Sequence, residues 1–60
     1  MTISDLTALT ALAVAHHGNF LRVGTLAWAV FSMVAHAEAF AEAAKLPRYD
    51  VIGSIVRVYL

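Results

Sequence analysis

The chain is organised around Val23–Ala37, VGTLAWAVFSMVAHA, fifteen residues without a formally charged side chain. The whole chain of 60 residues shares this character: charged residues are 13% of it and apolar residues 62%. Soluble domains carry about 25% charged residues. So few charges would leave large apolar patches on a water-exposed monomer. The composition therefore favours a lipid bilayer, or the interior of an assembly, around a single small domain covering residues 1–60.

Outward from this stretch, residues 20–46 predict one long apolar helix. The segment has no proline, its one glycine lies near its start, and Lys45-Leu46-Pro47 is typical of a helix end. A helix of this length spans about 39 Å, more than the roughly 30 Å of a bilayer's hydrocarbon core. Arg22 can reach the interface from one end of the helix. We therefore expect a single-pass protein of a bacterial inner or photosynthetic membrane.

The flanking segments complete an all-α expectation. Residues 5–17 are rich in Ala, Leu and Thr and predict a short N-terminal helix, which a turn at Gly18-Asn19 separates from the long helix. Residues 48–60 have apolar side chains at helical spacing and predict an amphipathic helix at the membrane interface. The β-branched residues of this tail leave a strand or an extended arm as the alternative.

On the expected long helix, Thr25, Ala29, Ser32 and His36 fall on one side. In lipid, such a stripe of small side chains lets another helix or a flat cofactor approach the backbone. Thr25, Ala29 and Ser32 are the predicted helix-packing residues, and Ala29, Ser32 and His36 the predicted cofactor-binding ones. His36 is interpreted as an axial ligand of a tetrapyrrole metal or an interhelical hydrogen-bond partner, with a neutral interfacial histidine as the alternative. The predicted interfacial anchors are Arg22, Trp28, Tyr49 and Tyr59.

The remaining histidines and the charge pattern exclude other classes. Adjacent residues on a helix point about 100° apart, so His16 and His17 form no two-ligand face, and a zinc site joining them with His36 is disfavoured. The net charge is zero and no basic run is present, which argues against nucleic-acid binding. No nucleophile–base motif or phosphate loop occurs, so we expect no enzymatic activity.

Several short motifs resemble one known family. Leu6-Thr7-Ala8-Leu9-Thr10, His17-Gly18 with Phe20 behind it, and Val34-Ala35-His36 are similar to the β polypeptides of purple-bacterial light-harvesting complexes. The resemblance implies a single membrane span in which His36 ligates bacteriochlorophyll magnesium, with Ser32 one turn earlier. It also implies bacteriochlorophyll and carotenoid as cofactors, which the residues alone do not identify.

Three functions are expected, in this order. The first is a non-enzymatic small membrane subunit of a bioenergetic or photosynthetic complex, packed between partner helices and in contact with lipid. The second is a light-harvesting polypeptide that binds pigment through His36. The third is a soluble helical subunit buried in an oligomer through the alanine faces of its helices.

Overall fold

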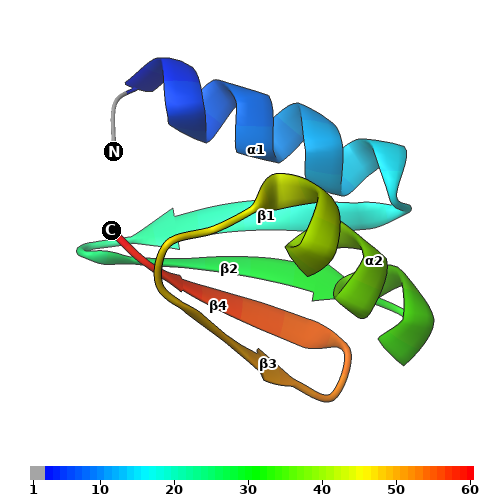
Figure 1. The fold of residues 1–60 in the computed structure, drawn as a ribbon. Coiled ribbons are helices and arrows are strands. Elements are labelled where there is room, and N and C mark those ends of the chain that lie inside the picture. Colours follow the sequence, from blue (N-terminus) through cyan, green and yellow to red (C-terminus); the bar gives the residue numbers. More distant parts are fainter. Residues whose placement is uncertain (1–2) are drawn as a thin grey trace.

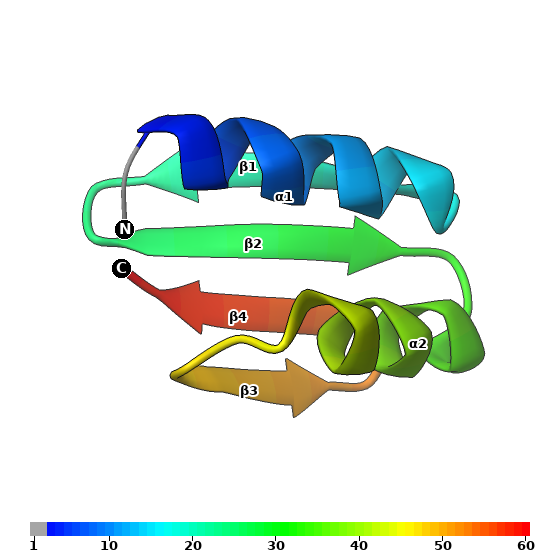
Figure 2. The same cartoon turned by 45° about the horizontal axis from the view of Figure 1, so that its top comes forward.

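The chain folds as two consecutive helix–strand–strand units that share one antiparallel sheet. The computed structural model describes residues 3–60, and the side chains from Asp5 onward. The elements in order are α1 (Ile3–Ala15), β1 (Gly18–Val23), β2 (Leu26–Phe31), α2 (Val34–Ala44), β3 (Tyr49–Ile52) and β4 (Ile55–Tyr59). The strand order is β1-β2-β4-β3, and both helices lie on the same face of the sheet (Figures 1 and 2).

Each unit closes its hairpin with the same kind of turn. Val23-Gly24-Thr25-Leu26 joins β1 to β2, and Ile52-Gly53-Ser54-Ile55 joins β3 to β4. Gly24 and Gly53 have φ values of 63° and 60°. A glycine with positive φ at the first position of a two-residue loop is the requirement of a type II′ turn, whose twist matches that of the paired strands. The two turns therefore fix the registers of both hairpins.

Gly18 opens β1 at a place where no other residue fits. It is paired with Phe31 of β2, and a Cβ added to Gly18 would lie 2.4 Å from the Phe31 ring. The missing side chain lets that ring cross the end of β1 and reach the core, where its centroid lies 5.3 Å from that of Phe40.

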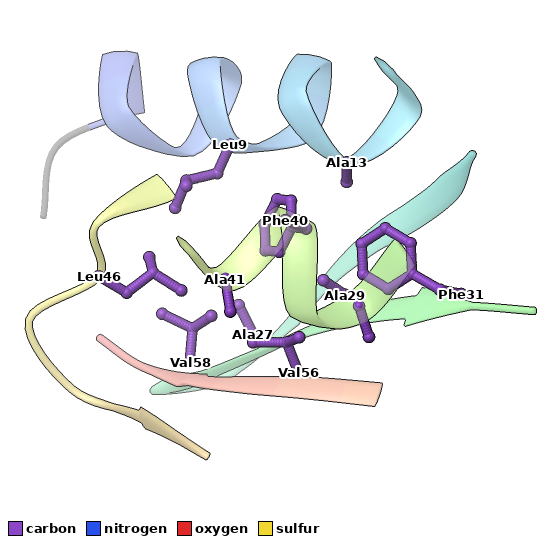
Figure 3. Close-up of a cluster of buried hydrophobic side chains, with 11 residues drawn as sticks. Leu9, Ala13, Ala27, Ala29, Phe31, Phe40, Ala41, Leu46, Val56 and Val58 are labelled. Carbon is purple, nitrogen blue, oxygen red and sulfur yellow. The ribbon is translucent and has the colours of Figure 1, made fainter. Parts of the chain in front are cut away.

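The hydrophobic core fills the layer between the helices and the sheet (Figure 3). Phe40 of α2 is its largest fully buried side chain, followed by Val56 and Val58 of β4. Many other core positions are alanines, which let α2 lie close to the strands. The buried apolar residues are Leu9, Ala13, Ala27, Ala29, Phe31, Ala37, Phe40, Ala41, Leu46, Val56 and Val58.

The predicted helix over residues 20–46 is wrong. Its first half forms β1 and β2, and only Val34–Ala44 is helical. The physical reason is the Gly24-Thr25 turn, which folds β1 and β2 onto each other. Alternate residues of β2 thereby reach the core, and Phe20 of β1 packs against it. Among residues 3–60, no helix combines the length and the apolar character needed for a membrane span. This corrects the all-α class, the single membrane span and the expected location in an inner or photosynthetic membrane.

The N-terminal segment is helical as predicted, whereas the C-terminal segment is not. A helix does form near the predicted residues 5–17, but as α1 it spans Ile3–Ala15 and ends before His16. The predicted turn at Gly18-Asn19 is instead the start of β1, and the chain reverses one residue earlier, at His17. The tail is not an amphipathic helix; the alternative of a strand is the one found, as β3 and β4.

Candidate functional site

The face of the sheet turned away from the helices is the main candidate site, and we call it the open face. Ala27, Ala29 and Phe31 of β2 are buried on the helix side, so Leu26, Trp28 and Val30 point the other way. Residues that are paired directly across neighbouring strands point to the same face of the sheet, so the strand registers identify the members of this face on β1, β3 and β4. The open face consists of Asn19, Leu21, Val23, Leu26, Trp28, Val30, Asp50, Ile52, Ile55, Arg57 and Tyr59.

This open face is largely apolar. Leu21, Val23, Val30 and Ile52 expose 58%, 60%, 43% and 51% of their surface. An antiparallel sheet with one covered face ordinarily alternates apolar and polar residues along its strands. Strand β2, LAWAVF, has apolar side chains on both faces, as do strands that are covered on both sides. The open face therefore has the composition of a surface that is buried against something else.

A polar cluster, formed by Asp50, Arg57 and Tyr59, occupies the β3–β4 corner of the open face. The guanidinium of Arg57 donates to the Asp50 carboxylate at 2.7 Å, and the Tyr59 hydroxyl donates to the same carboxylate oxygen. The Arg57 guanidinium also lies 5.8 Å from the ring centroid of Trp28 and 5.3 Å from that of Tyr59. Both charges of the open face thus have a partner within the same chain.

These contacts shift the pKa values of the cluster. The hydrogen bond from Arg57, and then that from Tyr59, lower the pKa of Asp50 because both favour the ionised carboxyl. The Asp50 contact in turn raises the pKa of the Tyr59 hydroxyl, whose proton it holds. The stabilisation from Asp50 is complete above the unfolded value of about 3.9 and is lost as the pH falls through the lower folded pKa. That from Tyr59 is complete below about pH 10 and is lost as the pH rises through the higher folded pKa.

Replacing Arg57 by glutamine is therefore expected to raise the pKa of Asp50 toward about 3.9. Carbon-13 NMR titration of the Asp50 carboxyl measures this directly. The matched control is Arg22→Gln, because the Arg22 side chain donates instead to the Gly24 carbonyl at 3.1 Å in the other hairpin. An Asp50 that titrates at its ordinary value in the unmodified chain would refute the assignment, as would an equal shift in the control.

A second candidate feature is a pair of histidines, His17 and His36. Their ring centroids are 5.1 Å apart, and the ring planes are tilted by 37°. Nδ1 of His36 is shielded from solvent and forms no hydrogen bond with the residues that the structure describes. Leaving such a buried polar atom unpaired costs about 1–3 kcal/mol. The pair therefore contains a nitrogen that lacks a partner within residues 3–60.

The structure does not bring the predicted packing stripe together. Thr25 lies in the β1–β2 turn, Ala29 is buried in the middle of β2, and Ser32 is exposed beyond the other end of that strand. Of this set only His36 is on a helix, in the first turn of α2. The stripe was inferred from a helix that is absent, which corrects its helix-packing role.

The predicted interfacial anchors occupy separate strands. Arg22 lies on β1 and Tyr49, which is exposed, on β3. Trp28 and Tyr59 do come together, since both lie on the open face beside Arg57. The residues that the sequence interpretation missed are Leu21, Val30, Asp50, Ile52 and Arg57. The two Gly-containing turn sequences were the signal that could have located these positions.

An apolar hollow of about 460 Å³ lies on the opposite side of the molecule, between α1 and the end of α2. Its volume is in the range of small-molecule sites, but such sites also use a few convergent polar groups to orient their ligand. Among the described residues around the hollow, the only charged one is Asp5. The apolar lining is Ala8, Leu9, Leu12, Ala43, Ala44, Leu46 and Pro47.

Comparison with protein-family models, with curated proteins and with solved structures finds no match for this chain. The resemblance to light-harvesting polypeptides thus gains no support from relatives. The single long helix that it implied is absent from residues 3–60, so the light-harvesting and membrane assignments are corrected with the fold. The open face and the histidine pair are the two main candidate sites among residues 3–60.

Proposed function

We propose that this chain is a non-enzymatic subunit of an assembly and that its open face associates with the open face of a second copy. The observation that carries the proposal is the apolar character of β2 on both sides. Burying exposed apolar surface contributes about 25 cal/mol per Å², so covering Leu21, Val23 and Val30 together is strongly favourable. The low charge led us to expect a subunit of an assembly, and the proposal keeps this expectation. It differs in that the apolar surface is covered by protein and not by lipid.

Charge supports a second copy as the partner. The net charge of the chain is zero, so two copies approach without overall repulsion. Asp50 and Arg57 form their ion pair within one chain and bring no unpaired charge into the interface. Two sheets can pack face to face about 10 Å apart with their strands inclined by about 30°. Such a dimer is isologous, since each copy contributes the same patch.

The available area fits a dimer. A standard interface covers about 800 Å² on each partner. This is about a fifth of the 3819 Å² of accessible surface of the chain. One large face of a molecule with extents of 27 × 19 × 18 Å supplies an area of this order.

The fluorescence of Trp28 tests the proposal. Trp28 is the one tryptophan of the chain and lies near the centre of the open face, between Leu21 and Arg57. In the dimer we expect its emission to be shifted to shorter wavelength and shielded from acrylamide. Dilution below the dissociation constant should shift the emission to longer wavelength and open Trp28 to the quencher.

Unfolding is the alternative cause of such a change, and far-UV circular dichroism recorded on the same samples separates the two. An unchanged dichroism spectrum together with newly quenchable Trp28 supports dissociation of the open face. Full quenching at every concentration of the folded chain would show that the open face is uncovered, contrary to the proposal.

A further inference from the structure

We propose that His17 and His36 together bind one divalent transition-metal ion, such as Zn²⁺, with one nitrogen of each imidazole as a ligand. Imidazole nitrogen is a ligand that Zn²⁺, Cu²⁺ and Ni²⁺ all accept in proteins. This site is separate from the open face and does not depend on the proposed dimer.

The backbone explains how two residues nineteen positions apart meet. Helix α1 ends at Ala15, and His17 adopts the left-handed conformation with φ of 66°. This turns His17 away from the direction that it would have on a continued helix. His36 lies in the first turn of α2, which begins just beyond β2. Because β1 and β2 are antiparallel, the start of β1 and the end of β2 adjoin (Figure 2). The rings of the two histidines are in contact at that end of the sheet.

The spacing of the rings fits a shared ion. A Zn–N bond of about 2.0–2.1 Å plus about 1.1 Å from nitrogen to ring centre places each centroid about 3.2 Å from the metal. Two such rings at a tetrahedral angle of about 109° have centroids about 5.2 Å apart. The observed separation is 5.1 Å. The observed separation of the centroids is therefore compatible with both rings ligating one ion.

The electrostatic setting of the pair is mixed and leaves coordination positions open. The C-terminal end of α1 carries partial negative charge and favours a cation, whereas the N-terminal end of α2 opposes one. The unpaired Nδ1 of His36 shows that this ring is not committed to another partner within the described chain. Within the described residues no group of three His, Cys, Asp or Glu side chains converges. The described side chains therefore supply two ligands at most, and any other ligand of the ion must approach from the side of His17, which is exposed.

Calorimetric titration of the chelator-treated full chain with ZnCl₂ tests the proposal. His17→Asn keeps a residue that tolerates the left-handed conformation, and His36→Gln keeps a polar side chain. We expect each substitution to weaken Zn²⁺ binding at least about tenfold, since even partners that only orient a metal ligand contribute about 10–100-fold. His16→Gln is the matched control, because His16 precedes the left-handed residue and makes no ring contact with His36 among the contacts of the described chain. It should leave the affinity unchanged.

A second measurement uses the unmodified chain, so its result does not depend on whether the variants fold. Paramagnetic Ni²⁺, added below one equivalent, should broaden the imidazole NMR signals of His17 and His36 before those of His16. Binding that weakens equally in the His16 variant would overturn the proposal. So would equal broadening of all three histidines, or the absence of both heat and broadening.

Discussion

Replacing Phe40 by alanine is expected to remove a large part of the free energy of unfolding of the chain. Phe40 is the largest fully buried side chain and lies in the middle of the core (Figure 3). Truncating a buried phenylalanine to alanine lowers the free energy of unfolding by about 3–5 kcal/mol. At about 0.05–0.15 kcal/mol per residue, a domain of this size has a free energy of unfolding of about 3–9 kcal/mol. The neighbouring Ala37 and Ala41 are too small to fill the cavity, so little of the loss is recovered by repacking.

Urea unfolding followed by circular dichroism at a fixed protein concentration measures this loss. Val34→Ala is the control in the same helix: Val34 is half exposed, and its truncation should change the free energy of unfolding by less than about 0.5 kcal/mol. A Phe40→Ala chain that unfolds cooperatively with a loss below about 1 kcal/mol would contradict the central position of Phe40.

Replacing Val30 by lysine is expected to separate the proposed dimer into folded monomers. Val30 points out of the open face, so the substitution leaves the core of each chain untouched. In an isologous dimer it introduces two ammonium groups into one apolar interface. Burying an unpaired charge costs more than the contact contributes, and we expect the dissociation constant to rise at least about 100-fold.

Val14→Lys is the matched control for this substitution. Val14 exposes 61% of its surface but lies on α1, on the opposite side of the molecule from the open face. Sedimentation equilibrium of the two variants compares the surfaces directly. If the open face forms the dimer, the Val30 variant is monomeric with a native circular dichroism spectrum and the Val14 variant is dimeric. A Val30→Lys chain that remains as dimeric as the control would place the interface elsewhere.

The sequence indicates the low charge and the first helix, but not the sheet. Period-two alternation is normally recognised by polar residues on the outer face. In Leu26–Phe31 both faces are apolar, so the run is equally compatible with a buried helix. The same feature that hid β2 from prediction is the one that makes the open face a candidate interface. The Gly24-Thr25 and Gly53-Ser54 turn sequences were the signals that could have distinguished strand from helix.

The candidate sites differ in how far they could be predicted. A two-residue turn at Gly53-Ser54 fixes the register of its hairpin, which places Asp50 opposite Arg57. The ion pair between Asp50 and Arg57 could therefore have been predicted from the sequence once the turn was recognised. The meeting of His17 and His36 was not, because it depends on the left-handed conformation of His17 and on the sheet that brings two helix ends together. The spacing of the two histidines along the sequence does not indicate that their rings are in contact.

The mass of the unmodified chain in solution, measured by light scattering over a dilution series, shows whether two copies associate. We expect twice the chain mass of 6.5 kDa at high concentration and a reversible decrease toward one chain mass on dilution. At about 1 mM protein, an association with a dissociation constant as weak as about 1 mM is still detected. The mass of a single chain at that concentration would contradict the claim that the open face pairs with a second copy.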